Sequence, residues 1–458
     1  MLPVANRVAL VVDGTRGVRP AVRSRGSRPC RRWRTVAALL AGLLLATAAC
    51  GGDPAASTDL AVERPAADSD EAAALAEGIN AVGYDLFRAE AADSEQDVVL
   101  SPLSIGLAFG MLDAGATGET AAALSELFGY PVEGEARWSA FNTLDQRIVA
   151  SRTTEDGAEM VVRLANRQFP DEAFEPVEGF DETIARWFGA GIEPLPIRAD
   201  PQASRERING WVSERTSGRI PDLLPDGVLG PDAALVLVNA LYLEAAWSNP
   251  FEAELTEDEA FTRLDGSTVT VPTMMGGGLP GPALVTDEYE AVVLGYADGD
   301  DELLLVVPTS GHFTDVEAAF DGDLVASIDE EMGRHDRAAA GDPQPNVVLH
   351  LPRFASNTTL LLRERLEQDL GATGLFDVPG GLAGIHEEVT LGDAIHAADI
   401  EVDEEGTIAA AATALMLDGS EEGPPPTIIR ADRPFLYLIR HQPTGANLFV
   451  GRVLDPSA

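Results

Sequence analysis

Apolar residues recur at helical spacing in the first part of the folded chain. A helix is expected from Glu71 to about Arg88. Its apolar face consists of Leu75, Ile79, Val82 and Leu86. Helices are also predicted over residues 103–114, where Pro102 suits the first turn, and over residues 117–128. This part of the chain is therefore predicted to be mainly helical.

Short apolar runs between turn residues predict strands, and most of them lie in the second half of the chain. These runs are residues 98–100, 235–243, 291–296, 303–307, 347–351, 394–402 and 436–439. The glycine-rich stretch 276–281 has no helical pattern after it and is interpreted as a turn. Since helices and strands do not alternate regularly, the order favours one α+β domain over a doubly wound parallel sheet.

The first 49 residues have the features of a signal peptide. Arg31, Arg32 and Arg34 precede an apolar run at residues 36–46, and small residues follow it. That order is typical of an export signal, and the run is too short for a permanent membrane span. The predicted organisation is a signal peptide at 1–49, a flexible tether at 50–70 and a single folded domain at 71–458.

Cys50 is the candidate lipidation site. The small residues before it resemble the lipobox of bacterial lipoproteins, in which the cysteine is acylated and becomes the mature N-terminus. Thr47 stands where leucine is usual, and the alternative is ordinary cleavage with an incidental Cys50. Cys30 is the other cysteine, so the body of the chain has no disulfide framework or cysteine nucleophile. We expect an exported protein, either lipid-anchored on the outer face of the cell membrane or secreted.

Charge limits the partners of this chain, whose formal charge is −43. Residues 1–49 hold nine of the 32 basic residues and one of the 75 acidic ones, which leaves 23 bases, 74 acids and a net charge of −51. An acidic body repels nucleic acids, heparin-like polyanions and anionic lipids. We expect none of these partners, and membrane contact only through an N-terminal lipid. The sequence has no HExxH or GxSxG motif, and we expect no metal, no cofactor and no enzymatic activity.

Several segments between residues 71 and 456 resemble the serpin family of serine protease inhibitors, and they follow the family's order. They are residues 98–127, 208–224, 237–251, 271–275, 349–354, 401–413 and 432–453. The resemblance implies the α+β serpin fold, with helices packed around three β-sheets and an exposed reactive-centre loop. It also implies a monomer whose partners are serine proteases.

Residues 401–413 look like the serpin hinge, which precedes the reactive-centre loop. Its candidate functional residues are Glu404, Glu405, Gly406, Thr407, Ala409, Ala410, Ala411 and Ala412. Gly406 suits a pivot, and the alanines alone would favour a helix, which is the alternative. If the run becomes a strand, alternate residues from Thr407 onward face inward and are small enough to enter a sheet. Ile408 replaces the glutamate that is usual in inhibitory members.

The resemblance implies a suicide mechanism. A protease serine attacks the loop and forms an acyl-enzyme. The cut loop then inserts as a new central strand of the large sheet, moves the protease across and distorts its active site. One alternative is a non-inhibitory serpin that acts as a surface binding protein. Another is a solute-binding lipoprotein, which would need two lobes with parallel sheets.

The bond offered to the protease is expected after Ser420 and before Glu421, counting the usual hinge length from Glu404. Leu417 and Met416 are alternatives that a chymotrypsin-like pocket would accept. The loop contains no arginine, and the specificity pocket of a trypsin-like enzyme requires a cation. Elastase-, chymotrypsin- or subtilisin-like proteases are therefore the expected targets.

Buried polar residues are expected beneath the large sheet. Ser101, Ser104, Asn239 and His396 match the serpin shutter, a polar cluster that must open for insertion. Trp247 matches the breach, where the loop first enters the sheet. The alternative is that the four polar residues are hydrogen-bonded core residues without a control function and that Trp247 is an ordinary core aromatic.

Overall fold

The structure is a computed structural model that describes residues 62–149, 151–153, 159–230, 233–279, 282–338, 347–392, 394–407 and 426–457. The predicted signal peptide, Cys50 and the first part of the predicted tether lie outside these ranges. Part of the hinge and every candidate for the cleaved bond also lie outside them: Ala409, Ala410, Ala411, Ala412, Met416, Leu417, Ser420 and Glu421.

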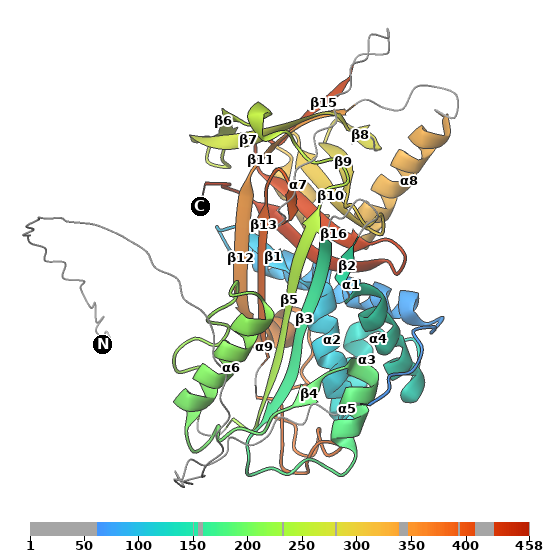
Figure 1. Cartoon of the computed structure of the whole chain (residues 1–458), viewed down its shortest axis with the longest axis vertical. Coiled ribbons are helices and arrows are strands. Elements are labelled where there is room, and N and C mark those ends of the chain that lie inside the picture. Colours follow the sequence, from blue (N-terminus) through green and yellow to red (C-terminus); the bar gives the residue numbers. More distant parts are fainter. Residues whose placement is uncertain are drawn as a thin grey trace, which may run out of the picture. The chain divides into compact units, whose positions relative to one another are not determined.

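The strands of the described residues form three β-sheets (Figure 1). The large sheet has the order β12 (Phe354–Leu361), β13 (Ile395–Val402), β14 (Gly406–Thr407), β5 (Leu235–Ala246), β3 (Glu159–Pro170) and β2 (Ser151–Thr153), with β4 (Gly191–Ile192) beside β3. The second sheet has the order β1 (Val98–Leu100), β17 (Ala446–Val453), β16 (Phe435–His441), β10 (Asp301–Pro308), β9 (Tyr289–Gly295) and β8 (Ala283–Val285). The third has the order β15 (Thr427–Arg430), β11 (Val347–Pro352), β7 (Thr268–Leu279) and β6 (Glu257–Thr262).

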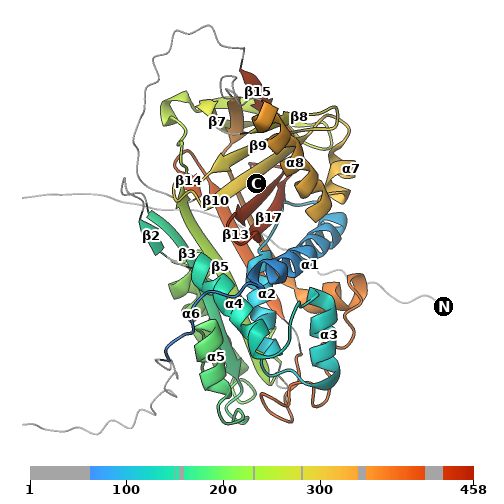
Figure 2. The same ribbon diagram turned by 90° about the vertical axis from the view of Figure 1, so that its right-hand side faces the viewer.

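Helices pack around these sheets, and Figure 2 shows α1 and α2 side by side next to β17. The helices are α1 (Ala72–Asp93), α2 (Pro102–Asp113), α3 (Gly118–Phe128), α4 (Glu135–Ile148), α5 (Phe180–Phe188), α6 (Pro201–Arg215), α7 (Phe313–Ala318), α8 (Gly322–Ala338) and α9 (Leu362–Glu364). Two further short turns are η1 (Ala253–Leu255) and η2 (Arg365–Asp369). In the described part of the chain, the helices are all too short or too polar to cross a membrane.

Strand β5 contributes to two hydrophobic clusters because successive side chains point to opposite faces of a sheet. Leu237, Leu241 and Leu243 belong to the main core. Val236 and Val238 face the other way and pack in the cluster that contains the apolar residues of α6. The large sheet is therefore covered on both faces at β5, so a strand that joined it there would be buried.

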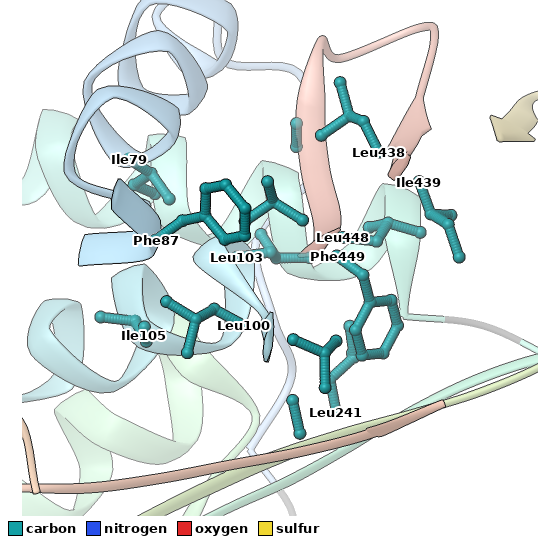
Figure 3. Packing of buried hydrophobic residues seen from close by; sticks show 14 of the residues in the cluster. Ile79, Phe87, Leu100, Leu103, Ile105, Leu241, Leu438, Ile439, Leu448 and Phe449 are labelled. Carbon is teal, nitrogen blue, oxygen red and sulfur yellow. The ribbon is translucent and has the colours of Figure 1, made fainter. Parts of the chain in front are cut away.

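The main core joins α1 and α2 to the second sheet and to β5 (Figure 3). Phe87 of α1, Leu103 of α2, Phe449 of β17 and Leu241 of β5 are all buried in it. All 12 residues of α2 are buried, which explains why this helix has no polar face. Helices α1 and α2 therefore belong to the core that covers one face of the large sheet.

The predicted elements are present, but some of their ends differ from the prediction. Helix α1 continues to Asp93, past the predicted end at Arg88. The turn predicted at residues 276–281 is wrong, because β7 continues through the glycines to Leu279. A Cβ at Gly276 would lie 2.9 Å from the Phe251 ring, so this glycine makes room for a buried aromatic side chain within a strand.

The N-terminal segment, residues 62–70, packs on α4. Arg64 donates hydrogen bonds to the Asp145 carboxylate at 2.5 Å and to the Asn142 side chain at 3.1 Å. The Ser69 N–H donates to the Thr143 hydroxyl at 3.1 Å. The sequence predicts a flexible tether here, but in the structure residues 62–70 contact the folded domain.

Candidate functional site

The two central strands of the large sheet, β13 and β5, pair with each other at one end. Their parallel pairing joins residues 395–397 to residues 238–240. Further along, β14 lies between them, with Thr407 opposite Val402 of β13 and opposite Ala245 of β5. The residues that lead into the loop therefore already form a short central strand, and they separate β13 from β5 at that end.

Gly406 is required by the close approach of β14 to β5. A Cβ at this position would lie 2.0 Å from the carbonyl oxygen of Ala245. The turn before Gly406 is held by the Asp403 carboxylate, which accepts the backbone N–H of Glu405 at 2.9 Å and that of Gly406 at 3.2 Å. A larger residue at position 406 would push β14 out of the sheet.

The Trp247 and Tyr296 rings lie next to β14 and the turn before it. Their rings stack at 4.6 Å, and the Tyr296 hydroxyl is hydrogen-bonded to the fully buried Thr407 hydroxyl at 2.7 Å. The Trp247 indole N–H donates to the Asp403 carbonyl at 3.0 Å, and its backbone N–H donates to the Glu405 carbonyl at 2.9 Å. Trp247, predicted at the breach from the sequence, therefore bonds to the turn before β14 and stacks on the tyrosine that bonds to Thr407 of β14.

Glu404 is held by a charged contact at the same end of the sheet. Its side chain is 7% exposed, and Arg353 donates to its carboxylate oxygens at 2.6–2.9 Å. The Thr256 hydroxyl donates to the same carboxylate. Burial alone raises the pKa of Glu404, but the hydrogen bonds from Arg353 and Thr256 outweigh it and hold the pKa below its usual range. Glu404 therefore stays ionised and joins the turn to Arg353, which lies between β11 and β12, and to Thr256, which precedes β6.

Hydrogen bonds join three of the four predicted shutter residues, Ser101, Ser104 and His396, close to where β13 pairs with β5. The Ser101 backbone N–H donates to His396 Nε2 at 3.1 Å, and the Ser104 N–H donates to the Ser101 hydroxyl at 3.3 Å. His396 is opposite Asn239 in the strand register. Ser101 is also the N-cap of α2, so its hydrogen bond to His396 links this helix to β13, one of the two strands that would have to separate.

His396 is neutral in this cluster. Because its Nε2 accepts a backbone N–H, the ring hydrogen is on Nδ1. Burial lowers the pKa of the His396 imidazole to about 3. A polar but uncharged side chain therefore lies at the point where β13 and β5 would separate.

This arrangement can accept one more strand between β13 and β5. Within the described ranges, His, Cys, Asp and Glu side chains do not gather in groups of three or more that could hold a metal ion. A strand inserted between β13 and β5 would gain backbone hydrogen bonds on both sides, at the cost of the existing pairing at residues 395–397. The geometry thus allows β14 to continue between these two strands.

Several contacts of this site were missed from the sequence. Arg353 lies in the serpin-like segment 349–354, but nothing in that segment indicates that Arg353 faces Glu404. The sequence predicts Tyr296 only as the end of a strand, and no pattern marks Thr256. Each comes from an element far from the hinge in the sequence, so only the folded chain brings them together.

Comparison with known proteins identifies the family of this chain. The family model described as Serpin (serine protease inhibitor) matches residues 77–456. Antithrombin-III of Mus musculus is 32% identical over 378 residues, which cover 80% of this chain and 78% of that protein. An uncharacterised serpin-like protein of Thermococcus kodakarensis is 32% identical over 382 residues, which cover 82% of this chain and 85% of that protein.

A solved structure has the same fold. Tengpin, a thermophilic serpin crystallised in its native state, superposes with a TM-score of 0.74 at 22% identity, covering 88% of this chain and 99% of its own. The chain therefore belongs to the serpin family. The description of the family names protease inhibitors rather than proteases.

Proposed function

We propose that this protein inhibits serine proteases by offering its loop for cleavage and inserting the cut loop as a new strand between β13 and β5. The observation that supports this most directly is β14, which places Gly406 and Thr407 between these two strands. Insertion would extend β14 toward the end where β13 and β5 still pair. The protease would be carried along as an acyl-enzyme on the loop.

The proposed targets are proteases of the elastase, chymotrypsin or subtilisin type. The loop has no arginine for a trypsin-like pocket, and it offers Leu417, Met416 and Ser420 instead. The bond after Ser420 is the proposed cleavage site, with Leu417 and Met416 as the other candidates.

We also propose that the protein acts outside the cell, exported through the signal peptide at residues 1–49 and anchored by a lipid on Cys50. Electrostatic repulsion between the acidic domain and anionic lipids would leave this anchor as the main membrane contact. Mass spectrometry of the mature N-terminus, from a bacterial host that processes lipoproteins, tests this: an acylated Cys50 is expected. An unmodified N-terminus would contradict the anchor.

The test of inhibition mixes the mature protein with elastase, chymotrypsin, subtilisin and trypsin. A complex that survives SDS is expected with at least one of the first three proteases but not with trypsin. Mass spectrometry of the released C-terminal peptide locates the cut. The nicked protein should also melt at a clearly higher temperature than the intact one, because the inserted loop adds a buried strand.

The outcome that contradicts inhibition is cleavage by every protease without a stable complex and without a rise in melting temperature. That result would favour the non-inhibitory serpin that acts as a surface binding protein. A catalytically inactive protease, with its active-site serine replaced by alanine, is the matched control and should form no covalent complex.

A further inference from the structure

Polar side chains flank the path of the loop on the face of the large sheet that α6 covers (Figure 1). Ala397 of β13 and Ala240 of β5 pack in the cluster that contains the apolar residues of α6. Because strand residues alternate between the two faces, every second residue after these alanines lies on the same face. Those residues are Asp399, Glu401, Tyr242 and Glu244. The path between β13 and β5 therefore has carboxylates on both sides, beyond the point where the two strands pair.

Arg219 reaches these carboxylates from the segment that follows α6. Its Nη1 donates to Glu401 Oε2 at 2.7 Å. Burial lowers the pKa of the Arg219 guanidinium, but the hydrogen bond to Glu401 and the charges of Glu401 and Asp399 outweigh it and raise the pKa above its usual range. Burial raises the pKa of the Asp399 carboxyl, and Arg219 opposes that shift. Arg219 therefore offsets the negative charge on β13.

The segment that carries Arg219 is attached to β5. Ser217, two residues before Arg219, is hydrogen-bonded to the Tyr242 side chain of β5. Ile220, one residue after Arg219, packs in the cluster that includes residues of β5 and α6. The contact of Arg219 with Glu401 therefore connects the β5 side of the path to β13.

Insertion of a strand must break the contact between Arg219 and Glu401. A new strand moves β13 and β5 apart by about 4.8 Å, the spacing of neighbouring strands. A contact of 2.7 Å does not survive this separation while the segment of Arg219 stays on β5. Without Arg219, the carboxylates of Asp399 and Glu401 would repel that of Glu244 across the path. Loss of Arg219 thus removes an attraction and exposes a repulsion, and both changes favour separation of the strands.

We infer that Arg219 is a positioning residue for loop insertion: through Glu401 it holds β13 against β5 until the loop is cut. The inference rests on the proposed function, because it concerns the step that traps the protease. The side chains of Arg219 and Glu401 are 36% and 46% exposed, so their pair adds little to equilibrium stability. The effect of losing Arg219 is therefore expected in the opening of the sheet more than in the melting temperature.

Hydrogen exchange of the whole uncut protein measures this opening without a protease, in peptides from β13 and β5. Arg219→Gln should exchange about twofold to fivefold faster there, the range that loss of an exposed ion pair allows. Arg219→Lys should exchange like the unmodified protein, because the contact uses a single N–H and needs no guanidinium fork. Asp226→Asn is the matched control, since it breaks the 2.6 Å pair with Arg205, which joins α6 to the segment after it. Exchange in β13 and β5 should not change in this control.

The second measurement uses a protease that forms a stable complex, under conditions in which the unmodified protein gives both complex and cleaved product. The ratio of these products reports the rate of insertion relative to the rate of deacylation. Arg219→Gln should raise this ratio about twofold to fivefold, and Arg219→Lys should leave it unchanged.

The outcomes separate this inference from the proposed function. Equal exchange in Arg219→Gln and the unmodified protein, or fast exchange that persists in Arg219→Lys, would overturn the role of Arg219. Faster exchange with an unchanged product ratio would overturn its link to insertion. Faster exchange in Arg219→Gln, when the unmodified protein forms no complex with any protease, would support the contact across the path and contradict inhibition.

Discussion

At the scale of single residues, His396 is the side chain whose titration should influence stability most clearly. Its pKa is about 3 in the folded protein, against 6.5 as the ordinary value. The neutral form is favoured by folding, so the contribution is complete above pH 6.5 and is lost as the pH falls toward 3. The free energy of unfolding should decrease by about 1 kcal/mol for each pH unit below 6.5.

The measurement is urea unfolding of the protein and of His396→Gln between pH 7 and pH 5. Burial raises the pKa of the Asp97 carboxyl to about 6, which acts in the opposite direction in this range. Asp97 is common to both proteins, so the difference between their curves isolates His396. Parallel curves would contradict the assignment of a neutral buried imidazole.

Arg353 is the second residue for which the structure makes a prediction. Arg353→Gln removes the charged donor of the nearly buried Glu404 and should lower the free energy of unfolding by about 1–2 kcal/mol. Urea unfolding at pH 7 measures the loss. Arg219→Gln is the control, because its partner Glu401 is exposed, and exposed pairs contribute about 0–1 kcal/mol. Equal losses of unfolding free energy in the two variants would contradict the claim that the nearly buried Glu404 carboxylate depends on Arg353.

At the scale of elements, the N-terminal segment, residues 62–70, is part of the folded domain because it pairs with polar side chains of α4 that are buried under it. Asp145 is 6% exposed, and its pKa is raised by burial although Arg64 opposes the shift. A protein that begins at Asp70 leaves this carboxylate without Arg64. Such a truncation should cost about 3 kcal/mol of stability in thermal or urea unfolding.

Asp145→Asn in the truncated protein is the matched variant, since it removes the charge that truncation leaves unpaired. It should recover part of the loss. If the truncated protein is as stable as the full mature chain, the contacts of the segment contribute nothing and the tether extends to residue 70 after all.

Strand β14 gives a prediction about the trap itself. Thr407→Arg would place a charge in a fully buried position beside Tyr296, at a cost of several kcal/mol. Because Thr407 already lies in the sheet, the charge should drive β14 out of it, and insertion must then bury the charge again. Insertion should slow by more than about tenfold, so the acyl-enzyme hydrolyses first and cleaved loop accumulates instead of complex. Gel quantification of the two products measures this. Thr407→Ser keeps the hydroxyl and should inhibit normally; similar product ratios for both variants would contradict insertion through β14.

The sequence predicts well those elements whose apolar residues all lie on one face that packs on the core. Helix α1 packs one face on the core, so its spacing is visible. Helix α4 was missed because Asn142, Thr143 and Asp145 are buried and polar, and their partners come from the N-terminal segment. In β3, the buried Arg167 and Gln168 interrupt the apolar pattern in the same way.

The candidate site was predictable only as far as the family motifs extend. They led to His396, Trp247 and the hinge, and the structure brings the hinge start to β5. The contact between Tyr296 and Thr407 joins residues 111 positions apart, and no local pattern encodes such a pair. The roles assigned to these residues in opening the sheet stay predictions until inhibition is measured.

At the scale of the whole molecule, charge repulsion should make stability depend on salt. Residues 50–458 carry 74 acidic and 23 basic residues. Most acidic residues therefore have no arginine to pair with, and unfolding relieves their mutual repulsion. Salt shortens the range of these interactions from about 10 Å at 0.1 M to about 3 Å at 1 M. Screening also weakens the exposed ion pairs, but these contribute little and are fewer than the repelling acids.

The melting temperature of the mature protein should therefore rise by several degrees between 0.05 M and 1 M sodium chloride, at roughly 2–4 °C for each kcal/mol gained. Potassium chloride at equal concentration is the control, because a screening effect depends on ionic strength rather than on the cation. A melting temperature that stays constant or falls would mean that the ion pairs of the arginines outweigh the repulsion. The acidic surface would then serve solubility alone, without a penalty for folding.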